Sequence, residues 1–394
     1  MPITAFVNTF SSFLGPILDS YIHIKYLSFC AFFIISIACA SINYYTNIYM
    51  IYFAMFLMGL ASGISLIPLT RNSWLYFPKH RGLISGLILF GYGSSSLIFT
   101  SIADALINPN YVSIDPETNL FNDEITNNTQ SFLRIFTSCL SILAFIGFLL
   151  IFEYQDKGKK TKVEQTETKQ LKEKEEIEVK HPLRQAYTSP QVWQMIIMNF
   201  CVLIFCFTCS NTYRTFGQIN LIDEKLLSVL SKIFALLNGS GRLFWGILFD
   251  RFSFKCLYSL IVITEIAISA TLYYAVKIPY LYLVLVSIQS LVLAGNVSLV
   301  VPLYPKIFGM KYSTIIFAVA CLISGTNSLV TPTLSKLILH NNEDYRTLFW
   351  VGTGFALISF TILLFFKEKK FKFIPDKDEK EKELVDQSPE TQEI

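Results

Sequence analysis

The 394-residue sequence has few charged residues and lacks the residue clusters that enzymes and metal sites require. Only 15% of the residues are charged, and the four histidines are scattered over polar segments without a shared motif. There is no Gly-x-x-x-x-Gly-Lys-Ser/Thr loop to cradle a phosphate, and seven of the eight cysteines lie inside apolar runs, without a Cys/His pattern for a metal ion. We therefore predict that the protein is not an enzyme and that it uses no nucleotide, cofactor or metal ion.

Hydrophobic residues, in contrast, make up 53% of the chain and include 35 Phe and 20 Tyr. Apolar stretches of about 18 or more residues recur along it, which is the length that a helix needs to cross a hydrocarbon core. This pattern predicts an all-α, multi-pass integral membrane protein in contact with the lipid bilayer. The net charge is +3, and the Lys and Arg residues gather in alternate loops and in two polar segments. This distribution sets the orientation of the chain in the membrane and does not indicate nucleic-acid binding. Which membrane holds the protein is left open.

The apolar segments divide into five and six around a charged linker. We predict an N-terminal helical bundle of five spans (1–153), a charged cytoplasmic linker (154–185), a C-terminal helical bundle of six spans (186–368) and a charged cytoplasmic tail (369–394). The linker is rich in Lys and Glu and has hardly an apolar residue, so it is expected to be solvated. The odd number of spans places the amino terminus outside.

A basic loop between the third and fourth apolar segments predicts the orientation of the chain. Arg71, Lys79 and Arg81 lie in this loop, which the positive-inside rule places in the cytoplasm. The polar stretch after the next span carries Asn127-Asn128-Thr129, an acceptor sequence for N-glycosylation. Because this stretch lies on the opposite side of the membrane from the basic loop, we predict Asn127 as a glycosylation site.

Arg242 is a permanent charge inside an apolar run that starts near Leu226. At about 1.5 Å per residue it lies roughly 12 Å from the charged end at Asp250, close to the middle of a hydrocarbon core about 30 Å thick. A charge at that depth costs about 2.5–3.5 kcal/mol on insertion scales. Arg242 is therefore expected to face a wet cavity, as a functional residue, or to pair with a neighbouring helix.

Two landmarks of the first half recur in the second half at nearly equal offsets, which indicates a duplicated unit. Gly15 and Asp19 correspond to Gly246 and Asp250, and Pro78-Lys79 corresponds to Pro305-Lys306. A Gly-x-x-x-Asp turn in each half, with a long charged linker between the halves, resembles the major facilitator superfamily. This resemblance covers essentially the whole chain. It implies two helical bundles with about 11 transmembrane helices, family helices 2 to 12, without a counterpart of the first family helix.

Three further motifs are similar to the oxalate/formate antiporter and monocarboxylate transporter families. They are Trp74-x-x-Phe77-Pro78-x-x-Arg81-Gly82, Asn238-Gly-x-Gly-Arg242-x-x-x-Gly246 and Tyr304-Pro305-x-x-Phe308-Gly309. The resemblance implies that Arg242 holds a substrate carboxylate, for which a planar fork of donors is suited. Asn238, one turn away, could add a neutral hydrogen bond. Other polar residues that could complete a substrate cavity are Tyr92, Asn296, Ser324 and Asn327.

The superfamily resemblance also implies that the Gly/Asp turns act as cytoplasmic latches between helices. A glycine permits close helix contact, and an aspartate at a helix end can cap a neighbouring helix only while that side is closed. The first copy has Ser20 where the family usually has arginine, which predicts a weaker latch there. The candidate gating residues are Gly15, Asp19, Lys25, Gly246, Asp250, Arg251, Lys255, Arg81 and Gly82.

The resemblance predicts a secondary active or facilitative carrier of a small organic anion, similar to a monocarboxylate, working by alternating access. Proton-coupled relatives have an aspartate where this chain has Asn238, so exchange or facilitated diffusion is favoured, with a proton or a counter-anion as the possible coupling species. Glu265 is interpreted as a structural ion-pair partner. Two alternatives stay open: a carrier of a neutral solute, and a transport-inactive receptor or regulatory protein that retains the fold.

Overall fold

The structure, a computed structural model, describes residues 2–19, 21–42, 48–107, 123–154, 182–220, 222–342 and 344–373. Within these ranges the chain forms helices joined by turns and contains no strand, which confirms the predicted all-α class. The predicted linker and tail lie mostly outside the described residues, so their bounds remain predictions.

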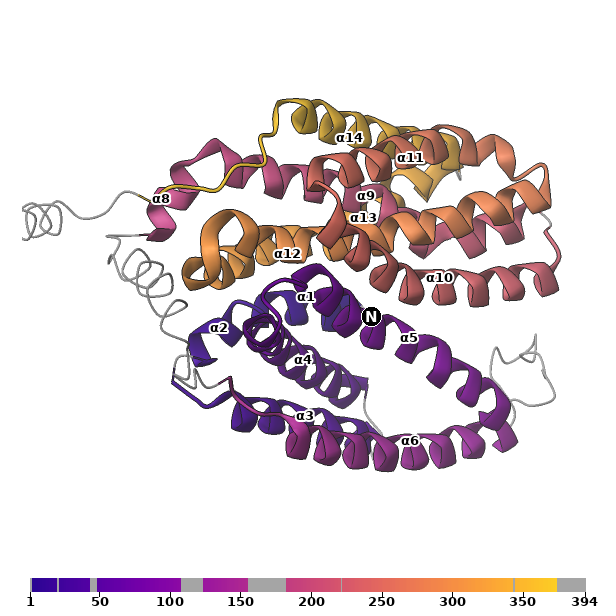
Figure 1. The fold of residues 1–394 in the computed structure, drawn as a ribbon. Coiled ribbons are helices and arrows are strands. Elements are labelled where there is room, and N and C mark those ends of the chain that lie inside the picture. The colour runs from indigo at the N-terminus through magenta and orange to yellow at the C-terminus, as the bar shows by residue number, and fades with distance from the viewer. Residues whose placement is uncertain are drawn as a thin grey trace, which may run out of the picture.

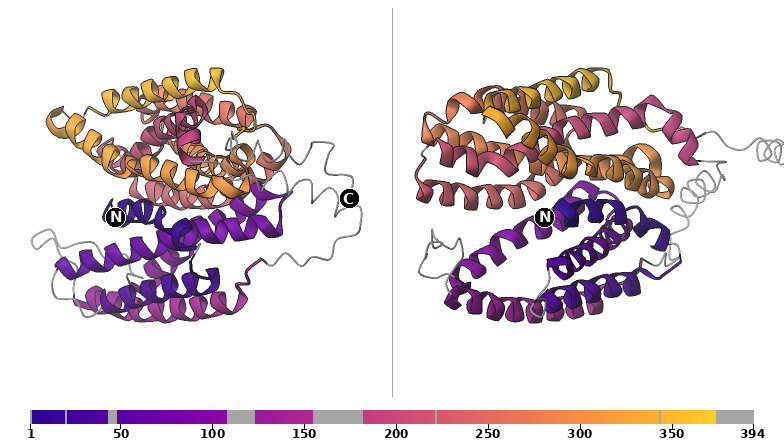
Figure 2. Two further views of the ribbon diagram at one scale, coloured as in Figure 1. Left: turned by 90° about the vertical axis from the view of Figure 1, so that its left-hand side faces the viewer. Right: turned by 180° about the vertical axis from the view of Figure 1, so that it is seen from behind.

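The helices form two layers, one from each half of the sequence, which lie against each other in Figure 1. The N-terminal half contains α1 (Pro2–Ser11), α2 (Leu14–Asp19), α3 (Ile24–Ile42), α4 (Ile48–Tyr76), α5 (Arg81–Ile107) and α6 (Asp123–Leu150). The C-terminal half contains α8 (Pro182–Thr188), α9 (Pro190–Ile219), α10 (Glu224–Arg251), α11 (Phe254–Ala275), α12 (Pro279–Gly325), α13 (Asn327–Asn342) and α14 (Tyr345–Phe365). The two views in Figure 2 show the same separation into two halves.

Polar residues at the helix starts explain where several spans begin. The side chain of Asp223 accepts a hydrogen bond from the backbone N–H of Lys225 at the start of α10, and Ser253 accepts one from Cys256 at the start of α11. Asp344 caps α14 in the same way, by accepting from Thr347. These side chains satisfy N–H groups that have no partner within the helix, so each apolar run starts at a defined residue.

Gly309 divides α12 into two crossings. A helix of 47 residues would be about 70 Å long, more than twice the thickness of a hydrocarbon core. Gly309 interrupts it with φ of 72°, a left-handed conformation that glycine adopts without a steric penalty. Pro302 and Pro305 lie in the two turns before this break. The two parts of α12 therefore serve as successive spans, the second continuing into α13.

Eight segments in the described part of the chain are long and apolar enough to cross a membrane. One of them, Pro279–Leu339, runs for 61 residues and includes the Gly309 break, so it provides two crossings. The more polar α10 has 28 residues, and α1 and α2 form a further pair of short helices of 10 and 6 residues. The predicted count of five and six spans includes these shorter or more polar helices, and it remains a prediction.

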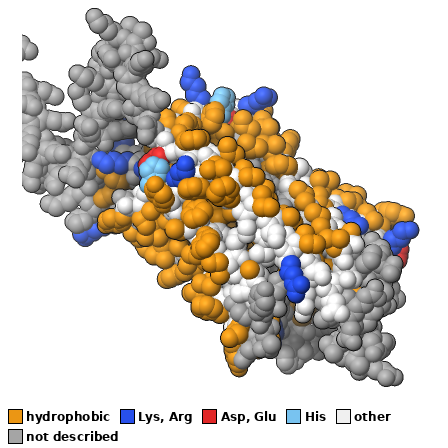
Figure 3. Space-filling view, turned by 90° about the horizontal axis from the view of Figure 1, so that it is seen from below, with side chains coloured by type: hydrophobic (Ala, Val, Ile, Leu, Met, Phe, Trp, Pro, Cys, Tyr) orange, Lys and Arg blue, Asp and Glu red, His pale blue; other side chains and the backbone are white. Residues whose placement is uncertain are grey.

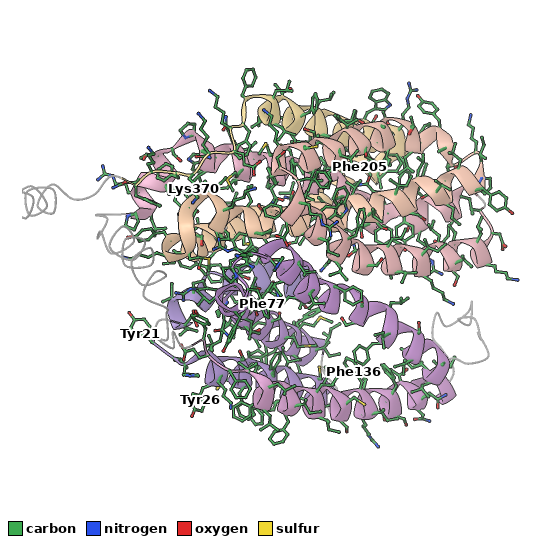
Figure 4. The ribbon with its side chains drawn as sticks, viewed as in Figure 1. Tyr21, Tyr26, Phe77, Phe136, Phe205 and Lys370 are labelled. Atoms are coloured by element: carbon green, nitrogen blue, oxygen red, sulfur yellow. The ribbon has the colours of Figure 1, made fainter. Side chains whose placement is uncertain are left out.

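The two halves differ in how tightly they are packed. The main hydrophobic cluster lies in the C-terminal half and surrounds large buried side chains such as Tyr258 and Phe205 (Figure 4). In α14, 39% of the apolar window is buried, whereas in α6 none of it is. Exposed Ile135, Ile142 and Phe145 lie along α6, and hydrophobic side chains cover most of the face of the N-terminal half seen in Figure 3. Such a face is suited to contact with lipid.

Candidate functional site

The two halves meet most closely where α5 packs against α10, and glycines form this seam. A Cβ atom on Gly86 would lie 2.7 Å from the Arg242 carbonyl oxygen, and one on Gly93 would lie 2.9 Å from the Gly239 Cα. Gly82 and Gly246 approach each other in the same way near the end of α10. Backbones can come this close only where side chains are absent, so the glycines bring the groups beside them into contact across the two halves.

Arg242 lies in this seam, in the middle of the glycine contacts. Its Nη1 donates a hydrogen bond to the carbonyl oxygen of Leu89 on α5 at 3.2 Å, and its Nη2 donates to Asn238 Oδ1 at 3.0 Å. The guanidinium carbon lies 5.6 Å from the centre of the Tyr92 ring, and its buried Nε has no hydrogen-bond partner. Arg242 thus joins the two halves through the neutral carbonyl group of Leu89, and its Nε–H remains available to donate a further hydrogen bond.

No carboxylate in the described part of the chain forms an ion pair with Arg242. Its contacts with Asn238 and Leu89 are to neutral oxygens, and Tyr92 adds only the negative face of a ring. A buried guanidinium without a counter-charge is unfavourable in a medium of low dielectric constant. The arrangement is therefore suited to accepting an anion.

Asp250 makes a second contact between the halves, two turns further along α10. Its Oδ1 accepts a hydrogen bond from the backbone N–H of Gly82, and its Oδ2 accepts one from Leu83, both at 2.8 Å. These N–H groups lie in the first turn of α5, which begins at Arg81, so they have no acceptor within their own helix. Asp250 therefore caps a helix of the opposite half.

The first copy of the Gly/Asp turn makes its contacts within the N-terminal half. A Cβ on Gly15 would lie 2.5 Å from the Ile64 carbonyl oxygen on α4, and Asp19 forms an ion pair with Arg71 at 2.8 Å. Lys25 lies over the ring of Phe148 on α6, 4.9 Å from its centre. The two copies thus differ: Asp250 forms hydrogen bonds with the opposite half, whereas the ion pair of Asp19 lies within its own half.

The remaining candidate gating residues lie at the end of α10 and just beyond it. Arg251 is exposed. Lys255 Nζ donates to the carbonyl oxygens of Leu364 at 2.8 Å and Phe366 at 3.1 Å, which fastens the start of α11 to the end of α14. Asn127 is exposed near the start of α6.

The other candidate substrate residues form a separate amide cluster between α9, α12 and α13. Asn199 donates to Ser324 Oγ at 2.9 Å and accepts from Asn296 at 3.0 Å, while Asn327 donates to the carbonyl oxygens of Ser324 and Phe200. The Oδ1 atoms of Asn296 and Asn327 are buried without a partner. No hydrogen bond between described residues links this cluster to Arg242.

The amide cluster lies next to a second contact between the halves. Gly325 follows Ser324, and a Cβ on it would overlap the side chain of Thr9 on α1. The candidate substrate residues therefore fall into two groups, one at each of the two seams that join the halves.

The interpretation of Glu265 as an ion-pair partner is wrong. Its carboxyl group is fully buried within the C-terminal half, where Oε1 accepts a weak hydrogen bond from Cys206 Sγ at 3.7 Å and Oε2 has no partner. Gln289 in turn donates to the same sulfur at 3.4 Å. The sequence revealed the charge on an apolar helix but not its neighbours, which come from α9 and α12.

Sequence reasoning also missed three partners in these sites. Leu89 and Leu83 contribute backbone atoms, which no side-chain pattern reveals. Arg71 was visible only as part of the basic loop, and its pairing with Asp19 depends on how α2 packs on α4. Among the described residues no group of three His, Cys, Asp or Glu side chains is placed to hold a metal ion.

The comparisons with known proteins agree with this architecture. A family model described as Major Facilitator Superfamily matches residues 3–298 and 214–389. Among curated proteins, apicoplast pyruvate carrier 1 of Toxoplasma gondii is 23% identical over an alignment of 238 residues, and the match covers 50% of this chain and 43% of the carrier. The match therefore spans less than half the length of that relative.

Solved transporters share the fold at low sequence identity. FucP, described as a fucose:proton symporter of E. coli, is 10% identical with a TM-score of 0.70, over 94% of this chain and 90% of that one. The proton:xylose symporter XylE is 14% identical with a TM-score of 0.69, over 93% and 86%. These likenesses establish the fold alone. With the family model matching both halves, the chain belongs to the major facilitator superfamily and is a multi-pass integral membrane protein.

Proposed function

We propose that the protein carries a small organic anion, similar to a monocarboxylate, across the membrane by alternating access, with Arg242 binding the carboxylate. The observation that carries this proposal is the position of Arg242. It is partly buried at the seam of the two halves, without an acidic partner in the described part of the chain and with a buried, unused Nε donor. A substrate carboxylate would neutralise this charge and could accept two hydrogen bonds from the guanidinium.

The pyruvate carrier of Toxoplasma gondii supports the same substrate class, since pyruvate is a monocarboxylate. Asn238 supports carboxylate binding as well, because it holds one side of the guanidinium at 3.0 Å. The Asn238 amide does not titrate at physiological pH, so this position favours exchange or facilitated diffusion over proton coupling. A proton or a counter-anion as the coupling species remains part of the proposal.

Asp250 is the proposed gate at the end of the molecule that carries the basic loop. Its bonds to Gly82 and Leu83 can exist only while α5 and α10 are close at that end, so they stabilise a state closed there. We assign Gly246, Arg81, Arg251 and Lys255 to the same gate. In the first copy, Gly15, Asp19 and Lys25 fasten α2 and α3 within their own half and act as its internal brace.

A neutral solute is the second candidate substrate. The amide cluster of Asn199, Asn296 and Asn327 presents donors and acceptors without charge, with two buried oxygen atoms that lack a partner. Such groups suit a hydroxylated solute, and the structural neighbours FucP and XylE are described as symporters of fucose and xylose. The amide cluster therefore favours a neutral solute, whereas Arg242 favours an anion.

Uptake into proteoliposomes separates the two candidates. Radiolabelled pyruvate, lactate, formate, oxalate, fucose and xylose are offered to the intact chain, to Arg242→Gln and to the control Arg346→Gln, which removes an exposed charge at the start of α14. We expect saturable uptake of one anion and a loss of at least about 10-fold in kcat/KM for Arg242→Gln only, since charge-assisted hydrogen bonds contribute about 1.5–3 kcal/mol.

Other outcomes contradict the anion proposal. Uptake of a sugar that Arg242→Gln leaves unchanged would move the substrate site to the amide cluster. If no solute moves in any variant, the protein is better explained as a receptor that has kept the transporter fold.

A further inference from the structure

A basic pocket lies where α8 meets the second part of α12. Figure 1 shows α8 at one end of the C-terminal half, beside part of α12. Its volume is about 640 Å³. The lining residues come from these two elements: Pro182, Leu183 and Arg184 on α8, and Lys311, Tyr312 and Ile315 on α12. The pocket lies outside both groups of candidate substrate residues.

Two hydrogen bonds hold the walls of this pocket in place. Tyr187 of α8 donates through its hydroxyl group to the carbonyl oxygen of Ile316 on α12 at 2.8 Å. Trp193 Nε1 donates to the carbonyl oxygen of Tyr187 at 2.9 Å, which fastens α8 to the first turn of α9. The pocket is thus a fixed feature of the fold, because each wall is tied to a transmembrane helix.

Aromatic residues place the pocket at the surface of the bilayer. Trp193 is 43% exposed and lies in the first turn of α9, and Tyr312 lines the pocket three residues after the break at Gly309. Trp and Tyr are enriched where a helix passes from hydrocarbon into the headgroup region. Leu183 and Ile315 then form an apolar wall beside the charged part of the pocket.

The charges in the pocket are of one sign. Arg184 and Lys311 are exposed cations on opposite walls, and none of the described lining residues is acidic. The surroundings are basic as well. Lys370, labelled in Figure 4, follows Lys369, whose carbonyl oxygen accepts a hydrogen bond from Gln191 at the start of α9. Glu368 is already engaged by Lys306. Two cations above an apolar wall complement a phosphate group that carries acyl chains.

We propose that this pocket binds an anionic phospholipid, with the headgroup phosphate between Arg184 and Lys311 and the acyl chains along Leu183 and Ile315. The lipid fills the space between α8 and α12 and so joins the segment that precedes α9 to the C-terminal half. Zwitterionic lipids bind more weakly, because their headgroups carry no net charge to match the two cations.

Native mass spectrometry of the full chain in detergent tests this proposal. The protein is titrated with phosphatidylglycerol or with phosphatidylcholine, and bound lipids are counted. The double variant Arg184→Gln/Lys311→Gln is compared with Lys225→Gln/Lys277→Gln, which removes the same number of exposed charges at the starts of α10 and α12. We expect about 5-fold weaker phosphatidylglycerol binding for each pocket cation removed, about 30-fold for both, and no change in the control.

Three results would overturn the proposal. Equal binding of the two lipids by the intact chain would exclude selection by charge. Unchanged binding in the pocket variant, with its thermal unfolding also unchanged, would place the lipid elsewhere. Displacement of phosphatidylglycerol by millimolar glycerol phosphate would show a site for free anions, in which the apolar wall has no part.

Discussion

Single atoms decide whether the two halves can approach each other. Gly86 and Gly91 lie on the same helix and are indistinguishable in the sequence pattern, yet their surroundings differ. A Cβ on Gly86 would lie 2.7 Å from the Arg242 carbonyl oxygen, whereas nothing lies within 4 Å of one on Gly91. Both glycines can be read from the sequence, but the sequence does not show which of them faces α10, because this depends on the rotation of α5 about its own axis.

We therefore expect substitution by alanine to affect stability and uptake differently at these two glycines. Gly86→Ala forces α5 and α10 apart, since the contact is to rigid backbone, and should lower both thermal stability and uptake, with a cost of about 1–3 kcal/mol. Gly91→Ala adds a methyl group in open space and removes the helix-weakening effect of glycine, so it should leave both unchanged or raise stability slightly. Thermal unfolding of the purified variants measures this difference. Equal melting temperatures for the two variants would contradict the close contact at Gly86.

At the scale of elements, the end of α10 and the start of α5 connect the two halves. The repeated Gly/Asp motif was visible in the sequence. The motif itself did not indicate that its two copies contact different partners. Asp250 caps α5 across the seam, while Asp19 pairs with Arg71 inside its own half. The difference arises from packing, because Gly15 lies against Ile64 of α4 whereas Gly246 lies against Gly82 of α5.

Removal of the Asp250 cap should loosen the first turn of α5. Asp250→Ala leaves the N–H groups of Gly82 and Leu83 without an acceptor, and hydrogen bonds to a charged group contribute about 1.5–3 kcal/mol. Amide hydrogen exchange in peptides covering Arg81–Ser85 should become about 10-fold faster or more. The control is Asp223→Ala, which removes a cap within α10 itself and should leave these amides unchanged. Unaltered exchange in Asp250→Ala would mean that the contact is absent in the membrane.

At the scale of the whole molecule, the lengths of the apolar segments predicted the fold class, but no sequence feature predicted the contacts between the two halves. The all-helical class, the spans and the superfamily followed from apolar lengths and from the repeated turn, since these are local features of the chain. The contact of Arg242 with Leu89 joins residues of different halves through a backbone oxygen. Asn296 and Ser324 were grouped with Arg242 from their positions on predicted spans, and the structure places them in a separate cluster with Asn199.

The two contacts of α10 suggest how substrate and gate are related. Arg242 and Asp250 lie about 12 Å apart along one helix and both contact α5. If they have the proposed roles, we expect a change in the contact of Arg242 to affect the contact of Asp250. A substrate carboxylate is a stronger acceptor for Arg242 than the Leu89 carbonyl, because its charge adds to the hydrogen bond. When the substrate binds, Arg242 would exchange its hydrogen bond to the Leu89 carbonyl group for one to the substrate, and the two halves would lose this contact.

Equilibrium binding of pyruvate and of its neutral amide, pyruvamide, to the purified full chain tests the central claim most directly. The two ligands have nearly the same shape and differ in charge, so their affinity ratio reports the contribution of the guanidinium. We predict that the intact chain binds pyruvate at least about 10-fold more tightly than pyruvamide, and that Arg242→Gln brings the ratio close to one while Arg346→Gln preserves it. A preference for pyruvate that survives in Arg242→Gln would show that the carboxylate is held elsewhere and would contradict the proposed site.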